Sequence, residues 1–400
     1  MAHEVWITGI GVVSALGAGY EEHAEALRMG RSGLVPHELF GGREPDPCVC
    51  GIVPHRCMPH SIEESAGIRA DLLLDFALRQ ALVSAGLGAG IHADIIAGTT
   101  LGNMHGATRY YSNVREGRPA DPSLVRHFLP CMPLAWAARH NGIAGRRLTV
   151  CSACASSNAA LGLAFRRISR GQCSRAIAGG FDAMSPFVAA GFNSLRLISA
   201  VPCKPFARDR NGLNPGEAAA MLVLESKEAA AERGARPLAR LAGYGEALEA
   251  YHYTRSDPRG SGTEAALRKA LTSAGAGPDA IGAIHLHGTG TEANDRSEYV
   301  ACRSVFGDRL AFIPACSTKS ATGHTFGAAG ALNAVLSIIS ICERIIPATL
   351  FSENIDPEFA GLSISTRVRE TSVVEMIASS ALGFGGEASV VIIARAPEDA

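Results

Sequence analysis

Two cysteines three positions apart are the first residues whose types and spacing suggest chemistry. They are Cys151 and Cys154 in TVCSACASSN, where β-forming residues give way to small, helix-forming ones. A cysteine at the first turn of a helix faces unpaired backbone N–H groups and the positive end of the helix dipole, which lower the pKa of its thiol. Cys154 fits that description, whereas Cys151 lies in the strand or bend before the helix, where a small apolar packing role is expected. The alternative for both is a buried structural cysteine.

Two histidines in glycine-rich segments add to this candidate site. His287 stands at the exit of a predicted strand in HLHGTGTEAND, and His324 stands in a Gly-flanked turn before an apolar helix in STKSATGHTFGAAGA. Loops at strand ends are where α/β proteins collect functional side chains. The sequence therefore predicts one site shared by a cysteine and two histidines.

The elements that position these residues alternate between strands and helices, which predicts a layered α/β fold. Predicted strands are residues 4–14, 94–100, 148–150, 175–178, 221–225, 283–287 and 389–394, and predicted helices are 70–85, 154–170, 228–233, 262–274, 297–306 and 327–342. Both parts of the chain place a reactive residue at a strand end before a small-residue helix. We therefore expect two pseudo-duplicated halves, residues 1–245 with the cysteine and residues 246–400 with both histidines.

The composition favours a large buried core and argues against two classes of partner. The chain has 400 residues, 47% of them hydrophobic and 19% charged, so one or two well-packed domains are expected. Its 37 Lys and Arg balance 38 Asp and Glu with no long basic run, which argues against nucleic acid or an anionic membrane as partner. The apolar stretch 328–346 is interrupted by polar residues, so we predict a buried helix and no membrane segment.

The eleven cysteines form no regular framework, and the first residues lack a basic, cleavable leader, so we expect a reduced, cytoplasmic protein. Cys48, Cys50 and Cys57, with His55 or His60, resemble a loose metal cluster. Their C-x-C-x6-C spacing fits no common zinc pattern, so no metal is predicted there.

Taken together, the motifs resemble one family. ACASS around Cys154, HGTGT at His287, STKSATGH ending at His324 and GFGG at residues 383–386 resemble, in order and separation, the β-ketoacyl-acyl carrier protein synthases of the I/II type, condensing enzymes of the thiolase superfamily. The resemblance runs nearly end to end and implies a thiolase-like layered αβαβα fold with no cofactor. RDRNGLNPGE further resembles synthases that build aryl polyenes or other specialised, polyketide-type chains.

The resemblance implies a reaction. Cys154 accepts an acyl group from the phosphopantetheine thioester of an acyl carrier protein. His287 and His324 then hydrogen-bond the thioester carbonyl of malonyl-acyl carrier protein while it loses CO2, because charge develops on that oxygen. The enolate attacks the acyl group and gives 3-oxoacyl-acyl carrier protein. Backbone N–H groups of Cys154 and Phe384 are the implied anion pocket for the second carbonyl, and the glycines beside Phe384 let it gate the acyl channel.

The resemblance also assigns supporting residues. Lys319 and Glu298 form an implied ion pair that polarises the site, with a buried pair of no catalytic role as the alternative. Four further positions are implied to bind substrate: Thr289, Thr291 and Thr254 on the pantetheine arm, and Leu101 in the acyl pocket, where ordinary core packing is the alternative.

Some positions depart from the family's pattern. Many relatives have an Asn two residues before the first histidine and a Glu nine after the second, which organise a monovalent cation, whereas this chain has His285 and Asn333. Glu387 and Ala388 follow GFGG in place of Thr-Asn. The nucleophile and both histidines are intact, so these changes point to altered regulation or substrate choice, and the chain lacks two of the residues that organise the cation in those relatives.

The implied partners are an acidic acyl carrier protein and a second ketosynthase-like chain, in a homodimer or a heterodimer. Lys204, Arg208 and Arg210 are candidate docking residues, with a solvated face as the alternative. Two other functions remain open: a non-catalytic chain-length-factor-like partner subunit, which typically lacks the cysteine, and a thiolase acting on CoA esters, which has a second cysteine near the C-terminus. An initiating-type synthase would have Asn in place of His324.

Overall fold

One mixed sheet of 11 strands runs through the centre of the computed structural model, which describes residues 3–38, 48–58, 68–126, 128–371 and 374–397. The strand order is β11-β10-β14-β15-β9-β1-β8-β7-β5-β6, with β2 paired to β1. The N-terminal strands are β1 (Val5–Ser14), β2 (Gly17–Ala18), β5 (Asp94–Gly98), β6 (Arg147–Val150), β7 (Arg175–Asp182) and β8 (Ala218–Ser226). The C-terminal strands are β9 (Ala239–Leu248), β10 (Ala283–His285), β11 (Ala315–Cys316), β14 (Met376–Gly383) and β15 (Glu387–Arg395).

The two ends of this sheet repeat one topology. From the edge inward, β6-β5-β7-β8-β1 has two parallel pairings followed by two antiparallel ones. The set β11-β10-β14-β15-β9 has the same sequence of pairings. β1 and β9 pair antiparallel and join the sets. The predicted pseudo-duplication is therefore visible in the strand order, and β9 is the counterpart of β1.

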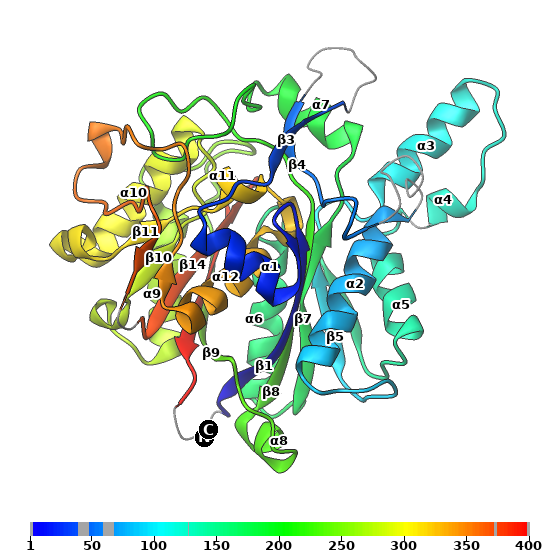
Figure 1. The fold of residues 1–400 in the computed structure, drawn as a ribbon, viewed down its shortest axis with the longest axis horizontal. Coiled ribbons are helices and arrows are strands. Elements are labelled where there is room, and N and C mark those ends of the chain that lie inside the picture. Colours follow the sequence, from blue (N-terminus) through cyan, green and yellow to red (C-terminus); the bar gives the residue numbers. More distant parts are fainter. Residues whose placement is uncertain (1–2, 39–47, 59–67, 127, 372–373, 398–400) are drawn as a thin grey trace.

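The two sets of strands face each other across a middle layer of helices, and further helices cover their outer faces. The two sets thus form two strand layers between three helix layers, five layers in all (Figure 1). α6 (Ser156–Ser169) and α12 (Ala329–Glu343) form the middle layer and pack against β7, β8, β14 and β15. α2 (Arg69–Ser84) and α5 (Cys131–His140) cover the N-terminal strands, and α9 (Ser261–Ala274) and α10 (Glu292–Phe306) cover the C-terminal ones. Alternate strand residues enter different clusters, Ala176 and Ala178 on the α6 side and Ile177 on the α2 side, as a strand buried on both faces requires.

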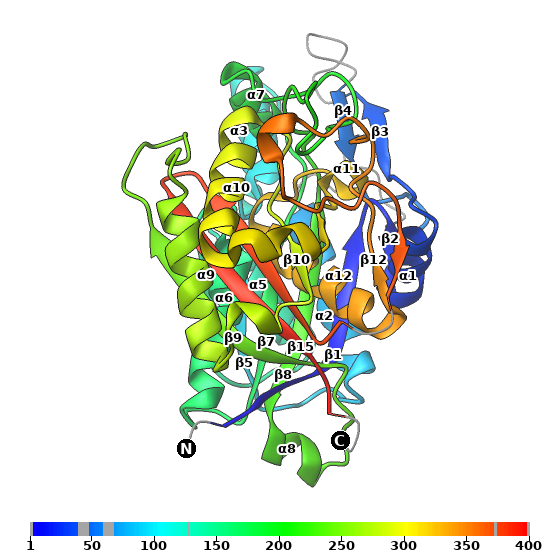
Figure 2. The same ribbon diagram turned by 90° about the vertical axis from the view of Figure 1, so that its left-hand side faces the viewer.

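Further helices and short strands lie around these layers. The helices are α1 (Gly19–Arg28), α3 (Met104–Arg115), α4 (Ser123–Arg126), α7 (Pro186–Ser194), α8 (Lys227–Glu232) and α11 (Lys319–Thr322), and the short strands are β3 (Leu34–His37), β4 (Cys48–Gly51), β12 (Ile345–Ile346) and β13 (Arg369–Glu370). In Figure 2, α7 lies at the opposite end of the molecule from α8. Because α7 follows β7 directly, the carboxyl ends of β7 and of the parallel strands β5 and β6 point to the α7 end.

The stretch Phe326–Glu343 is apolar and long enough to cross a bilayer, but 89% of it is buried inside the protein. A core helix of a folded protein passes the same test of length and composition. The burial agrees with the helix predicted from the sequence at residues 327–342.

Candidate functional site

Cys154 lies in a tight turn between β6 and α6. The helix begins at Ser156, two residues later than predicted, so Cys154 precedes its first turn. Ala153 has φ of 45°, a left-handed conformation that is unusual for a residue with a side chain. Ser156 Oγ holds the turn, accepting from Ser152 N at 2.8 Å and donating to Ala153 O at 2.6 Å. The turn presents the Cys154 side chain, only 6% exposed, to a cavity of about 370 Å³.

The expected low pKa of Cys154 is wrong for the free protein. Burial raises the pKa of its thiol to about 12, and the positive charge of Lys319, which lowers it, does not compensate. The negative charge of Asp182 raises it further. The thiol is therefore protonated at neutral pH, and it must lose its proton when it attacks.

Cys151 does not fill the apolar packing role expected from the sequence. It follows the last residue of β6 and is exposed, and it is not among the residues that line the cavity. Of the two cysteines in the motif, Cys154 is the one that faces the candidate site.

His287 and His324 line the same cavity as Cys154, although they come from different strand exits. His287 follows β10, and His324 follows the short helix α11. Their ring centroids are 5.1 Å apart and their planes are nearly perpendicular, at 84°. The predicted meeting of one sulfur and two imidazoles is therefore found in the geometry.

Both rings are neutral and poised as donors. Burial first, and then the charge of Lys319, lower the pKa of His287 and of His324 well below the ordinary value. Each Nδ1 is enclosed without a hydrogen-bond partner in the described part of the chain. A proton on Nδ1 would be a desolvated donor with no acceptor, so the favoured tautomer carries it on Nε2, at the edge of the ring that remains open to the cavity.

Lys319 and Glu298 act on His287 differently from the predicted ion pair. Within the described residues they form no direct salt bridge. Glu298 accepts hydrogen bonds from the backbone N–H of His287 at 2.7 Å and of Gly288 at 2.8 Å, and from Ser380 Oγ at 2.5 Å. Lys319 Nζ donates to the carbonyl oxygen of His287. Glu298 thus holds the N–H of His287 and Lys319 holds its carbonyl oxygen. Burial lowers the pKa of Lys319 to about 8.

The GFGG turn between β14 and β15 approaches the nucleophile. A Cβ on Gly383 would stand 3.1 Å from Cys154 N, so the turn lies against the backbone of the cysteine. Phe384 lines the cavity, and its ring centroid is 5.5 Å from that of Phe192. The ring of Phe192 also packs against that of Phe326. The Phe326 ring in turn stacks on His324, with 5.4 Å between the ring centroids and 30° between the ring planes. Phe192, which lines the cavity from α7, was not predicted as a site residue, because an aromatic residue in an apolar helix has no distinctive sequence signal.

The predicted substrate-binding residues divide into two groups. Thr254, Thr289 and Thr291 line the cavity, and the hydroxyls of Thr289 and Thr291 are 2.8 Å apart. Leu101 is not among the residues that line this cavity, so its role in an acyl pocket stays a prediction. It packs with Val188 and Phe326 in a small buried apolar cluster, as the alternative of core packing predicts.

The place implied for a monovalent cation does not fit one. His285 Nδ1 lies 3.1 Å from Ser337 Oγ, and its Nε2 lies 3.0 Å from Thr318 Oγ1, so both ring nitrogens are already satisfied. Asn333 has a buried Nδ2 donor with no hydrogen-bond partner among the described residues, whereas a cation needs oxygen ligands. In the described part of the chain no group of three or more His, Cys, Asp or Glu side chains is arranged to hold a metal ion, and His60 lies outside that part.

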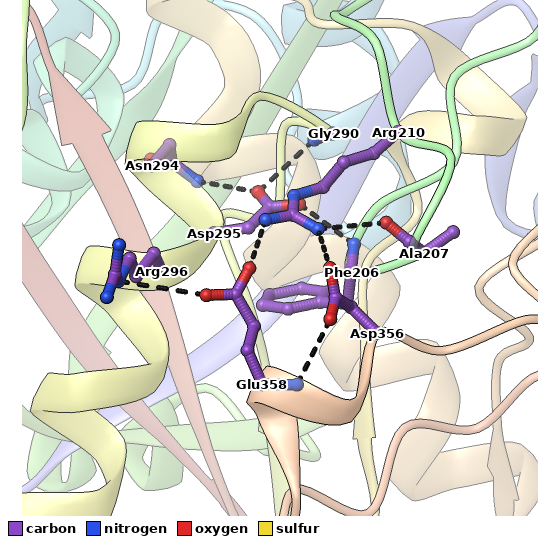
Figure 3. A network of polar contacts seen from close by, with 9 residues as sticks. All are labelled: Phe206, Ala207, Arg210, Gly290, Asn294, Asp295, Arg296, Asp356 and Glu358. Atoms are coloured by element: carbon purple, nitrogen blue, oxygen red, sulfur yellow. Dashed lines mark hydrogen bonds and ion pairs between the residues drawn. The ribbon is translucent and has the colours of Figure 1, made fainter.

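Arg210 is not the free docking cation that the sequence suggested. Figure 3 shows its guanidinium between two carboxylates: it pairs with Asp356 at 2.8 Å and with Glu358, and its side chain is 6% exposed. It also covers the ring of Phe359 at 4.8 Å. Lys204 pairs with Asp209 at 2.5 Å. Of the three candidates, Arg208 alone is exposed and has no ion pair within the described residues.

Buried neutral histidines also make a testable contribution to stability. His23 is completely buried, and its burial lowers its pKa to about 4. This pKa lies below the value near 6.5 expected in the unfolded chain, so neutral His23 stabilises the folded protein above pH 6.5. As the pH falls towards 4 this stabilisation is lost, and the free energy of unfolding decreases by about 3 kcal/mol in total. We expect His23→Gln to flatten the fall of the unfolding free energy between these pH values, measured by urea denaturation.

The control for this prediction is His55→Gln, since His55 is exposed. The control variant should keep the wild-type dependence on pH. Equal slopes for wild type and His23→Gln would contradict the prediction.

Comparisons with known proteins agree with this geometry. Residues 2–230 match the family model described as "Beta-ketoacyl synthase, N-terminal domain", and residues 238–353 match "Beta-ketoacyl synthase, C-terminal domain". The chain is 30% identical, over 96% of its length and 95% of the relative's, to a 3-oxoacyl-[acyl-carrier-protein] synthase 2 from Synechocystis.

Solved structures share the whole fold. The ishigamide ketosynthase/chain length factor superposes with a TM-score of 0.91 at 32% identity, over 99% of this chain and 100% of that one. A type II polyketide ketosynthase bound to a hexaketide, in complex with its acyl carrier protein, gives 0.89 at 26% identity over 99% and 100%. These neighbours confirm the predicted layered fold of two similar halves.

Proposed function

The chain belongs to the beta-ketoacyl synthase family, and we propose that it catalyses the decarboxylative Claisen condensation of an acyl group with malonyl-acyl carrier protein. The products are 3-oxoacyl-acyl carrier protein and CO2. The observation that carries the proposal is that Cys154, His287 and His324, from three separate strand exits, line one cavity. The curated relative and the polyketide neighbours support chain elongation of a fatty acid or polyketide.

In the first half-reaction, Cys154 Sγ attacks the carbonyl carbon of the acyl thioester. A new S–C bond forms, the bond to the carrier's sulfur breaks, and the departing thiol takes up the proton that Cys154 loses. The backbone N–H groups of Cys154 and Phe384 are the proposed donors to the oxygen that becomes negative. The close approach of Gly383 to Cys154 N supports this pairing.

In the second half-reaction, malonyl-carrier protein loses its carboxylate as CO2, and the electron pair of the broken C–C bond forms an enolate. The Nε2–H groups of His287 and His324 stabilise its oxygen, which is the role that their neutral state allows. The enolate carbon then attacks the acyl carbonyl, the bond to Cys154 breaks, and the sulfur regains one proton from solvent. Lys319 and Glu298 are positioning residues, because they hold the backbone of His287.

The channel for the pantetheine arm runs past Thr254, Thr289 and Thr291, whose hydroxyls are the proposed partners of its amide groups. Phe384 is the proposed gate, since its ring continues the aromatic wall formed with Phe192. A CoA-ester thiolase has less support, because the turn between β14 and β15 carries Phe384 and no cysteine.

The proposed partners are an acyl carrier protein and a second ketosynthase-like chain, in a homodimer or a heterodimer with a chain-length-factor-like subunit. The neighbours that contain such partners support both. We propose a cytoplasmic location, which is supported by eleven free cysteines. The proposed halves are residues 1–245 and 246–400, and the pairing of β9 as the counterpart of β1 favours moving this division to the segment before Ala239.

The proposal is tested by incubating the protein with acyl- and malonyl-carrier protein and following CO2 and product mass. We expect one CO2 per condensation and a 3-oxoacyl product two carbons longer than the starting acyl chain. A panel of acyl lengths, with and without candidate partner subunits, covers the specialised pathways. No elongation at any chain length with any partner would refute the condensing activity.

Arg196 and Arg255 give a prediction about docking. Both are exposed, both line the cavity, and neither has an ion pair within the described residues. The double variant Arg196→Glu/Arg255→Glu is expected to raise KM for carrier-bound substrates roughly tenfold, since it reverses charge towards an acidic partner. The KM for a short pantetheine thioester that lacks the carrier protein should change much less.

The matched control is Arg268→Glu, on the exposed face of α9 and away from the cavity. It should leave both KM values unchanged. Equal effects of the double variant on carrier-bound and carrier-free substrates would contradict a docking role.

A further inference from the structure

A buried carboxylate connects the turn of the nucleophile to the turn of the second histidine. Asp182, the last residue of β7, is fully buried. Its Oδ1 accepts from Thr99 Oγ1 at 2.5 Å and from Leu101 N at 3.0 Å, and its Oδ2 accepts from Thr100 N at 2.9 Å and from Gly327 N at 2.6 Å. Neutral donors thus satisfy both oxygens, and within the described residues no cation pairs with it.

One pair of contacts leads from Asp182 to Cys154. Asp182 accepts hydrogen bonds from the residues that follow β5, and one of these residues also contacts the turn that carries Cys154. Thr100 Oγ1 donates to Ala153 O at 2.9 Å. Ser156 Oγ, which closes that turn, also lies 3.3 Å from Thr99 O. A shift of this segment would therefore move the backbone that carries Cys154.

The other contact leads from Asp182 to His324. Gly327 follows Phe326, whose ring stacks on His324. The fit at Gly327 is tight: a Cβ there would stand 2.5 Å from Thr100 N and 2.7 Å from Asp182 Oδ2, so a side chain has no space. The turn that carries the histidine is thus tied, through the same carboxylate, to the segment that supports the cysteine.

We propose that Asp182 is a positioning residue that fixes the Cys154 turn and the His324 turn relative to each other for the condensation. This rests on the proposed function. Neither relative nor motif pointed to it from the sequence, since an aspartate after IAGGF has no spacing relation to either reactive residue. A carboxylate suits the task because its two oxygens accept four hydrogen bonds, which an amide cannot reproduce.

The charge of Asp182 also acts on the nucleophile. Its field raises the pKa of Cys154 and of Cys151, whereas Lys319 lowers that of Cys154. The cavity wall also carries His287 and His324, which are neutral, and the ionisable side chains of Arg196, Arg210, His252, Arg255 and Glu292. Burial raises the pKa of Asp182 itself to about 6, so it is largely ionised at pH 7.

The test is Asp182→Asn, which keeps the shape and removes the charge. In either orientation the new NH2 group replaces a carboxylate oxygen, so the backbone N–H of Leu101, or the N–H groups of Thr100 and Gly327, face a donor and lose their acceptor. We expect transfer of the acyl group to Cys154 and decarboxylation of the malonyl group each to slow by about a hundredfold, as for a misplacement of reacting groups by about 1 Å. In addition, the midpoint of the pH profile of Cys154 alkylation, followed by mass spectrometry of its peptide, should move to lower pH.

Asp94→Asn is the matched control. Asp94 is a buried aspartate that pairs with Arg167, and it is the first residue of β5, whereas Asp182 contacts the residues that follow the last one. It should leave the alkylation profile and both half-reactions unchanged. A second variant, Thr100→Val, keeps the charge and removes the hydrogen bond to Ala153 O. It should slow acylation without moving the alkylation midpoint, and it serves as the test if Asp182→Asn does not fold.

Either of two results would overturn the proposal: a folded Asp182→Asn protein with the wild-type alkylation profile and half-reaction rates, or a Thr100→Val protein with the wild-type acylation rate. Alkylation of Cys154 needs no carrier protein and no condensation. Its pH profile therefore reports on Asp182 even if the proposed reaction fails.

Discussion

Replacing Cys154 by alanine is expected to abolish acyl-enzyme formation and to lower condensation at least about a thousandfold, because the removed sulfur is the proposed covalent nucleophile. Within the described part of the chain, no other cysteine lines the cavity and offers a substitute. The measurement is the mass of the intact protein after incubation with acyl-carrier protein, together with the rate of 3-oxoacyl product formation. Wild type gains one acyl group, and the variant gains none.

Cys151→Ala is the control, since Cys151 is three residues away, exposed and outside the cavity. This variant should acylate and condense at close to the wild-type rate. An acyl adduct on Cys154→Ala, or loss of acylation in Cys151→Ala alone, would mean that the nucleophile has been misassigned.

The second large effect concerns the two histidines. His287→Ala and His324→Ala should each slow decarboxylation by roughly a hundred- to a thousandfold, or about 2.7 to 4 kcal/mol, the usual cost of one lost donor to a developing negative charge. Acylation of Cys154 should suffer less, since the two Nε2–H groups are assigned to the malonyl thioester. The double variant should cost less than the product of the single effects, because the rings act on one oxygen. CO2 release from malonyl-carrier protein measures the step.

His23→Gln is a suitable comparison here, because it changes a buried neutral histidine that does not line the cavity. It should leave CO2 release unchanged. If either alanine variant decarboxylates at the wild-type rate while acylation fails, the assignment of the donors to the second half-reaction is wrong.

Sequence periodicity was sufficient for the strands that are rich in branched residues, and insufficient for those built from small ones. β1 and β15 were predicted nearly within their observed limits, since Val and Ile dominate them. β9 (ARLAGYGEAL) and β14 (MIASSALG) were missed. In β9 the glycines allow α9 to approach, since a Cβ on Gly245 would stand 2.1 Å from Ala266 O. Tight packing of neighbouring elements, which is not local in sequence, selects small residues there.

That Cys154, His287 and His324 line one cavity was predictable, whereas their electrostatics were not. Cys154, His287 and His324 stand in motifs whose residues are contiguous, so a single sequence displays them. The pKa of Cys154 depends on its burial by segments such as the GFGG turn, more than 200 residues away, and the helix dipole argument considered only the local chain. The separate contacts of Lys319 and Glu298 with His287, and the links of Asp182, likewise depend on which loops the fold brings together.

The most direct measurement of the shared site is a single-turnover chase. The protein is acylated with an isotopically labelled acyl-carrier protein, freed of excess reagent and mixed with unlabelled malonyl-carrier protein, and the Cys154 peptide and the products are followed by mass spectrometry. We predict that the label leaves Cys154 at the same rate as CO2 appears and as labelled 3-oxoacyl-carrier protein forms. Label that stays on Cys154, or leaves it as free acid while CO2 is released, would contradict a cavity in which Cys154, His287 and His324 act on one condensation.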